Sequence, residues 1–149
     1  MHKILIAEAD TETRESYAWM VHNLGHETIQ CEDAIALLDL ATSEHEIDMV
    51  VMNETLPGAS PEQLLSVLKG LHGLRDVPIL VGSQHKSHAD LMKLLGGGAT
   101  RWFECPADPV ELAQAIEEDL QTRRFIHKMQ GKTQKVLVAA GPTSSWLLD

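Results

Sequence analysis

Cysteine and aromatic residues are scarce in this chain of 149 residues, which has two cysteines and 4% aromatic side chains. Two cysteines are too few for the disulfide framework of a small secreted protein and fit a reducing cytosol. So few aromatic residues argue against a platform on which bases stack. No apolar run approaches the length of a transmembrane segment, and the N-terminus lacks the layout of a signal peptide. We therefore expect a soluble, cytoplasmic protein that does not bind membranes.

Positive charge is also in short supply, because 12 lysines and arginines face 22 acidic residues and leave a formal net charge of −10. Such a surface repels nucleic acid, so we expect no direct nucleic-acid partner. The one basic stretch of the chain is TRRFIHKMQGK at residues 122–132. This stretch fits a solvated continuation of a helix, a linker or dimer contact, or a site for an acidic partner. The length fits one domain with an appendage.

Short apolar segments alternate with helix-start signals along the chain. Continuous apolar runs are typical of strands that are covered on both faces. We expect strands at residues 3–7, 26–31, 47–52, 77–81 and 101–104. Capping residues precede the intervening helices, at Asp10, Asp33, Ser60, Ser87 and Asp108, and the last helix is expected to reach Met129.

This alternation predicts an α/β fold, namely a flavodoxin-like, doubly wound, five-stranded parallel sheet with helices on both faces. The strand order 2-1-3-4-5 is the usual solution at this size, and a C-terminal extension follows it. Ligands of such sheets bind outside the carboxyl ends of the strands. The residues that follow strands 1, 3, 4 and 5 should therefore converge: 8–10, 53–55, 83–84 and Cys105.

Four segments of residues 2–121 resemble the receiver domain of bacterial response regulators. They are KILIAEAD, DMVVMNETLPGASPEQLL, VPILVGSQ and GGGATRWFECPADPVEL. The resemblance implies the flavodoxin-like fold and a role in two-component (phosphorelay) signal transduction. It also implies a pocket in which an aspartate accepts a phosphoryl group, an acidic pair holds Mg²⁺, a hydroxyl group follows the phosphoryl group and a lysine binds its oxygens.

This chain departs from the family at three of those four parts. Asn53 stands at the position of the aspartate, and its neutral amide is not a competent phosphoryl acceptor. Glu8 remains of the acidic pair, but Ala9 has no oxygen ligand to offer Mg²⁺. Cys105 replaces the lysine, and Ser83 alone keeps its chemical type. We interpret the chain as a non-phosphorylatable pseudo-receiver, without Mg²⁺ and without enzymatic activity, that acts as a protein-interaction or dimerisation module.

Two alternatives remain open at this point. The depleted pocket could bind a small molecule or an anion, or the chain could be a phosphoacceptor with rearranged ligands. For the second, Asp10 or Glu54 would have to supply a carboxylate, and Glu8 with Asp10 would be the candidate metal ligands. Asp10 is also placed to cap a helix, and Glu54 is expected to face away from the pocket.

Cys105 and the aromatic residues Trp102 and Phe103 are further candidates for a functional role. Cys105 precedes Pro106, a bond that is often cis in receivers, and its side chain is either a reactive thiol or a small apolar filler. Trp102 stands where the family has its aromatic switch. Together with Phe103 it is a candidate interface anchor.

The C-terminal segment KVLVAAGPT at residues 135–143 is similar to KILIAEADT at residues 3–11, with an offset of 132 residues. We interpret the organisation as a receiver-like domain at 1–122, an extended helix or linker at 123–134, and either the start of a second unit or an added strand at 135–149. An added strand over 136–139 would need a sheet edge or a partner copy, which predicts a homodimer. The candidate interface residues of this region are Arg123, Arg124, Val136, Leu137 and Val138.

Overall fold

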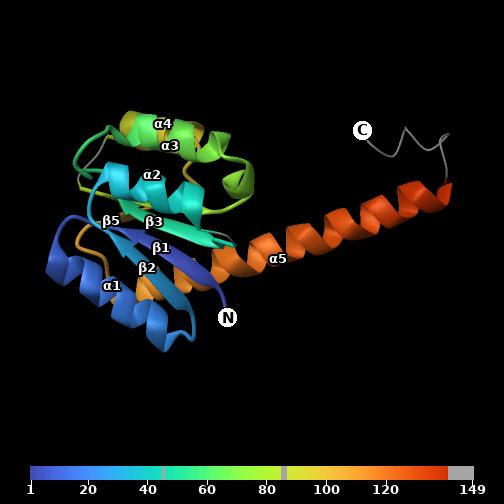
Figure 1. Cartoon of the computed structure of the whole chain (residues 1–149), viewed down its shortest axis with the longest axis horizontal. Coiled ribbons are helices and arrows are strands. Elements are labelled where there is room, and N and C mark those ends of the chain that lie inside the picture. The colour runs from blue at the N-terminus through green and yellow to red at the C-terminus, as the bar shows by residue number, and fades with distance from the viewer. Residues whose placement is uncertain (45, 85–86, 141–149) are drawn as a thin grey trace.

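The computed structural model describes residues 1–44, 46–84 and 87–140, although not the side chains of residues 127 and 130–140. Five parallel strands form one sheet in the order β2-β1-β3-β4-β5, as the sequence predicted (Figure 1). The strands are β1 (Lys3–Ala7), β2 (Glu27–Cys31), β3 (Met49–Asn53), β4 (Ile79–Ser83) and β5 (Arg101–Glu104). The expected strands lie at the right places, with ends that differ by up to two residues.

The helices begin where the capping residues predicted. They are α1 (Thr11–Asn23), α2 (Ala34–Ser43), α3 (Pro61–Gly70), α4 (His88–Gly96) and α5 (Pro109–Ala140), with a short 3₁₀ helix, η1 (His72–Leu74). At α3, the Ser60 side chain accepts from the Gln63 N–H while the Gln63 side chain accepts from the Ser60 N–H, which is a complete capping box. Asp108 accepts from the Val110 N–H at the start of α5.

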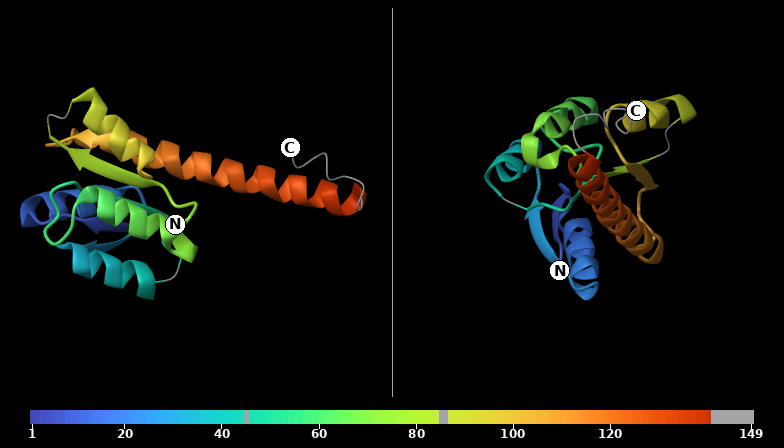
Figure 2. Two further views of the ribbon diagram at one scale, coloured as in Figure 1. Left: turned by 90° about the horizontal axis from the view of Figure 1, so that it is seen from above. Right: turned by 90° about the vertical axis from the view of Figure 1, so that its right-hand side faces the viewer.

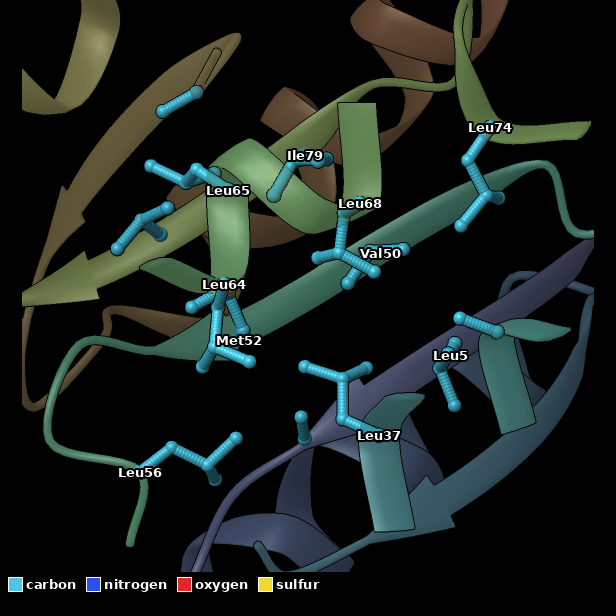
Figure 3. Close-up of a cluster of buried hydrophobic side chains, with 14 of the residues drawn as sticks. Leu5, Leu37, Val50, Met52, Leu56, Leu64, Leu65, Leu68, Leu74 and Ile79 are labelled. Carbon is cyan, nitrogen blue, oxygen red and sulfur yellow. The ribbon is translucent and has the colours of Figure 1, made fainter. Parts of the chain in front are cut away.

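Apolar side chains on the two faces of the sheet form two separate cores. One face packs against α2, α3 and α4 through a leucine-rich cluster, part of which Figure 3 shows: Leu5, Leu37, Val50, Met52, Leu64, Leu65, Leu68 and Ile79. The other face packs against α1 and α5 through Ile4, Ile6, Met49, Val51, Leu80, Leu112 and Ile116. Successive residues of β1, β3 and β4 alternate between these two clusters, which explains the continuous apolar runs of these three strands.

The register of the sheet brings the carboxyl ends of the strands level with one another. Ala7 pairs with Met52, Asn53 pairs with Gly82, and Ser83 pairs with Glu104. The segments that follow β1, β3, β4 and β5 therefore meet at the carboxyl end of the sheet, as predicted.

The last helix, α5, is longer than expected and projects beyond the sheet (Figures 1 and 2). It includes residues 136–139, so the prediction of an added strand there is wrong. A strand must find its backbone partners in a neighbouring strand, whereas a helix makes its hydrogen bonds within its own segment, and a projecting segment has no neighbouring strand. Residues 141–149 of the proposed second unit lie outside the described residues. Within the described residues, no helix is long and apolar enough to cross a membrane.

Candidate functional site

Asn53, the last residue of β3, is hydrogen-bonded through both ends of its amide. Its Nδ2 donates to Glu8 Oε1 at 2.7 Å, and its Oδ1 accepts from the backbone N–H and the hydroxyl of Thr55, both at 2.9 Å. These partners fix the orientation of the amide, because only the NH₂ group can donate to a carboxylate. The Asn53 side chain thus links the end of β1 to the loop after β3.

Glu8 is 5% exposed, and its second oxygen accepts from the Asp10 N–H at 2.9 Å. A buried carboxylate requires such partners to offset the loss of its hydration. If an aspartate stood at position 53, its carboxylate would face Glu8 and the two charges would repel each other unless a proton or cation came between them. At this point the Asn53 amide supplies a hydrogen-bond donor to the Glu8 carboxylate.

Asp10 acts as the N-cap of α1. Its Oδ2 accepts from the Thr13 N–H at 3.0 Å and from the Thr13 hydroxyl at 2.6 Å. These bonds lower the pKa of the Asp10 carboxyl. Asp10 therefore serves the helix, and only the backbone of Asp10 contacts Glu8. Among the described residues, no three histidine, cysteine or acidic side chains are placed to hold a metal ion.

Glu54, which was expected to face away from the pocket, is buried, at 8% exposed. Its N–H donates to the Gly82 carbonyl at 2.9 Å, which continues the β3–β4 pairing by one residue. This pairing directs its side chain to β4, where Oε1 accepts from the Gln84 N–H at 3.1 Å. Beside it, the Ser83 hydroxyl is 2% exposed and has no hydrogen-bond partner within the described part of the chain.

Cys105 packs against the floor of the pocket. The Cys105-Pro106 bond is cis, as predicted. A Cβ atom added to Gly82 would lie 2.7 Å from the Cys105 sulfur and 2.9 Å from the ring of Phe103, so the thiol and the ring occupy the space that a side chain on β4 would need. Burial raises the pKa of the Cys105 thiol, while the nearby Tyr17 hydroxyl lowers it to a smaller extent. This environment disfavours the reactive thiolate and supports the reading of Cys105 as a filler.

Arg14 and Tyr17 lie close to the pocket without having been predicted there, whereas Thr55 belongs to the range 53–55 that was expected to converge there. Arg14 donates through Nη1 to the Glu8 carbonyl at 2.8 Å, and Thr55 binds Asn53. Tyr17 packs edge-on against Phe103, with the ring centroids 6.1 Å apart. The hydrogen bond from Thr55 to Asn53 could have been predicted, because asparagine side chains often accept from the backbone N–H two residues further on. Arg14 lies one helical turn after Asp10, and only its position on α1 points to the pocket.

The candidate interface residues have different surroundings. Trp102 is 39% exposed on β5, but the Phe103 ring faces inward against Gly82 and Tyr17, so Phe103 offers little surface to a partner. Arg124 is exposed, whereas Arg123 binds Asp48 Oδ1 at 2.7 Å. Residues 136–138 lie in α5, and their side chains are not described.

A family model described as "Response regulator receiver domain" matches residues 4–117, which is most of the chain. The chain belongs to this family. Receiver domains act through other proteins in two-component signalling, and this places the chain in that class of signalling protein.

Individual relatives of this receiver are distant. The phosphate regulon regulatory protein PhoB of Klebsiella pneumoniae is 25% identical over 115 residues, which are 77% of this chain and 50% of PhoB. The polar-differentiation response regulator DivK of Brucella ovis is 24% identical over 78% of this chain and 94% of its own length. The chain thus spans about half the length of PhoB, whose function as a whole protein does not follow from this match.

Solved structures agree with the receiver fold. A CheY-like receiver domain from Methanospirillum hungatei superposes with a TM-score of 0.77 at 21% identity, over 83% of this chain and 97% of its own. NtrX of Brucella abortus reaches 0.79 at 22% identity, over 88% of this chain and 29% of its own. A receiver domain of a Pseudomonas aeruginosa sensor histidine kinase, described with magnesium in its active-site cleft, reaches 0.72 at 19% identity, over 80% of this chain and 98% of its own.

Proposed function

We propose that this receiver is not phosphorylated and works as a protein-interaction and dimerisation module in two-component signalling. The observation that carries the proposal is the hydrogen bond between Asn53 Nδ2 and Glu8 Oε1 at 2.7 Å. It puts a neutral amide, bonded at both ends, at the position where a phosphorylated receiver needs a carboxylate nucleophile.

The residues of the pocket do not fit Mg²⁺ as in a working receiver. Mg²⁺ requires oxygen ligands in near-octahedral geometry. Both oxygens of Glu8 accept hydrogen bonds, the Asn53 oxygen accepts two from Thr55, and Ala9 has no ligand atom. We therefore propose that magnesium, which the name of the Pseudomonas structure gives to that protein, has no role in this pocket.

Signalling through this domain would depend on partner binding, which can shift a conformational equilibrium without phosphorylation. We propose a protein partner or a second copy of the chain, no enzymatic activity and no direct contact with nucleic acid. The cytoplasmic location stays a prediction from cysteine usage.

The proposal is tested by incubating the full chain with acetyl phosphate and Mg²⁺ and measuring its intact mass. We expect no adduct, whereas phosphorylation adds about 80 Da. The control is the triple variant Ala9→Asp, Asn53→Asp, Cys105→Lys, which restores the family's residue types and should acquire the adduct. An adduct on the unchanged chain would refute the proposal and favour a phosphoacceptor with rearranged ligands.

One observation favours the alternative of a small-molecule site, namely the buried Ser83 hydroxyl without a partner. The carboxylates of Glu8 and Glu54 are both buried nearby and argue against an anion as the ligand. Thermal unfolding of the full chain with inorganic phosphate and a set of small neutral metabolites separates these cases. Stabilisation without a mass adduct supports the small-molecule site, and no stabilisation by any of them supports the interaction module.

A further inference from the structure

Charge is divided unevenly between the body of the domain and the projecting part of α5. Residues 1–123 hold 21 of the 22 acidic residues and 8 of the 12 basic ones, which gives them a formal charge of −13. Residues 124–140, which we call the α5 extension, hold four basic residues and no acidic one. The extension is therefore a cationic segment attached to a strongly anionic body.

The α5 extension also presents apolar surface. Leu120 is the last buried residue of α5 among those whose side chains the structure describes. Beyond it, Phe125 is 64% exposed and Ile126 is 46% exposed, next to the exposed cations Arg124 and Lys128. A projecting helix with exposed apolar side chains is the usual form of a segment that docks in a groove.

Charge decides which kind of surface this segment fits. Pairing of two extensions with each other would bring four positive charges against four more without an acidic residue between them, which is unfavourable. An acidic groove with an apolar floor would match both the positive charge and the exposed apolar side chains of the α5 extension. The anionic body of a second copy has such a groove.

That groove runs along α1 beside the start of α5. It has a volume of about 510 Å³ and is lined by Glu12, Glu15, Ser16, Trp19, Met20 and Pro109. Trp19 is 71% exposed, both glutamates are exposed, and no basic residue lines the groove. The groove along β5 is smaller, about 290 Å³, and contains Arg101, which is already paired with Asp119 at 2.9 Å. The α1 groove is therefore the better match for a cationic helix.

The α5 extension of a chain cannot reach its own α1 groove as a continuous helix. Pro109 lines the groove and is the first residue of α5, and Arg124 lies 15 residues later, about 22 Å away along the helix. The extension then continues away from the body (Figures 1 and 2). Contact between the two is therefore intermolecular.

We propose that the α5 extension of one copy docks in the α1 groove of a second copy. Phe125 would contact Trp19 and Met20, and Arg124 and Lys128 would face Glu12 and Glu15. If the contact is reciprocal, two copies close a symmetric dimer. This inference takes from the proposed function only that the domain binds protein, and it does not depend on whether Asn53 accepts a phosphoryl group.

The test is the dissociation constant of the full chain, measured by sedimentation equilibrium at low and high salt. We expect association that weakens with salt, because the contact joins opposite charges. The variant Arg124→Glu/Lys128→Glu should associate about tenfold more weakly, and Glu12→Lys/Glu15→Lys should do the same. Combining all four substitutions should restore association, since the charges are then exchanged. Trp19→Ala should also weaken it.

The matched control is Arg75→Glu/Lys93→Glu, which makes the same change in net charge at exposed positions on other elements. It should associate more strongly than Arg124→Glu/Lys128→Glu. A monomer under all conditions, loss caused by the extension variant but not by the groove variant, or no recovery in the combined variant would each overturn the inference. The mass measurement with acetyl phosphate is independent of these outcomes, so a failure of the docking proposal is distinguishable from a failure of the proposed function.

Discussion

The polar side chains at the centre of the Asn53 pocket are hydrogen-bonded within the chain, whereas those described on the α5 extension are exposed. In the pocket, the amide of Asn53 and the carboxylate of Glu8 bind each other and the adjoining backbone. In the extension, cationic side chains such as Arg124 and Lys128 are exposed, with no acidic residue in the same segment. The side chain at the signalling position of other receivers is thus hydrogen-bonded within this chain, whereas Arg124 and Lys128 on α5 are exposed to a partner.

This difference leads to a general expectation for substitutions. Changes in the pocket should alter the free energy of unfolding, because its hydrogen bonds and contacts lie within the chain. Changes in the α5 extension should leave that free energy almost unchanged, as for other exposed positions, and should alter association instead.

The largest loss of stability is expected for Gly82→Ala on β4. Its new methyl group would lie 2.7 Å from the Cys105 sulfur and 2.9 Å from the Phe103 ring, so side chains or strands must shift. Such overpacking costs about 2 kcal/mol of unfolding free energy. Urea unfolding measures it. If Cys105 acts as a filler, the same substitution in a Cys105→Ala background should cost less, and an equal cost in both backgrounds would contradict the packing account.

Asn53→Asp should cost about 1–2 kcal/mol at neutral pH, because the donor to Glu8 is lost and two carboxylates face each other. One carboxyl of this pair then has a pKa in the folded state above its unfolded value. The folded state binds the extra proton, so the loss is largest above the folded pKa and shrinks as the pH falls towards about 4. Urea unfolding of both proteins at several pH values measures the difference.

Asn53→Gln provides a control for Asn53→Asp, since it keeps a neutral amide and its cost should not depend on pH in this way. If the cost of Asn53→Asp is independent of pH, the repulsion between the two carboxylates is not its cause. Recovery of stability on addition of Mg²⁺ would show that a cation can replace the amide between residues 8 and 53.

The fold could be predicted because each of its signals is local. Apolar runs marked the strands, and serine and aspartate caps marked the starts of the helices, as the Ser60–Gln63 capping box shows. The end of α5 could not be predicted in this way. The segment VLVAA is compatible with a strand or with part of a helix on its sequence pattern alone, and in the structure α5 continues through it to Ala140.

The sequence predicts which residues come together at the candidate site, but it does not predict the contacts between them. Asn53 and Ser83 end their strands, Glu8 and Cys105 directly follow theirs, and the parallel order brings such residues together. The direction of Glu54 depends on one additional backbone bond to Gly82, and the role of Gly82 depends on the Cys105 side chain that packs over it. Neither can be read from spacing along the chain.

The body of the domain ends at Arg123 and the α5 extension begins at Arg124. These adjacent arginines give the prediction with the smallest expected effect. Arg123 binds Asp48 Oδ1 at 2.7 Å, and Asp48 Oδ2 in turn accepts from the Lys3 N–H at 2.9 Å, so Arg123 ties α5 to the first strand. Arg123→Ala should lower the unfolding free energy by about 0.5–1 kcal/mol, because this ion pair is partly exposed. Arg124→Ala should leave urea unfolding unchanged and weaken only the association of copies at low salt. Equal effects of the two substitutions on stability would show that the body extends further along α5 than the buried residues indicate, and the cationic segment available to a partner would then be correspondingly shorter.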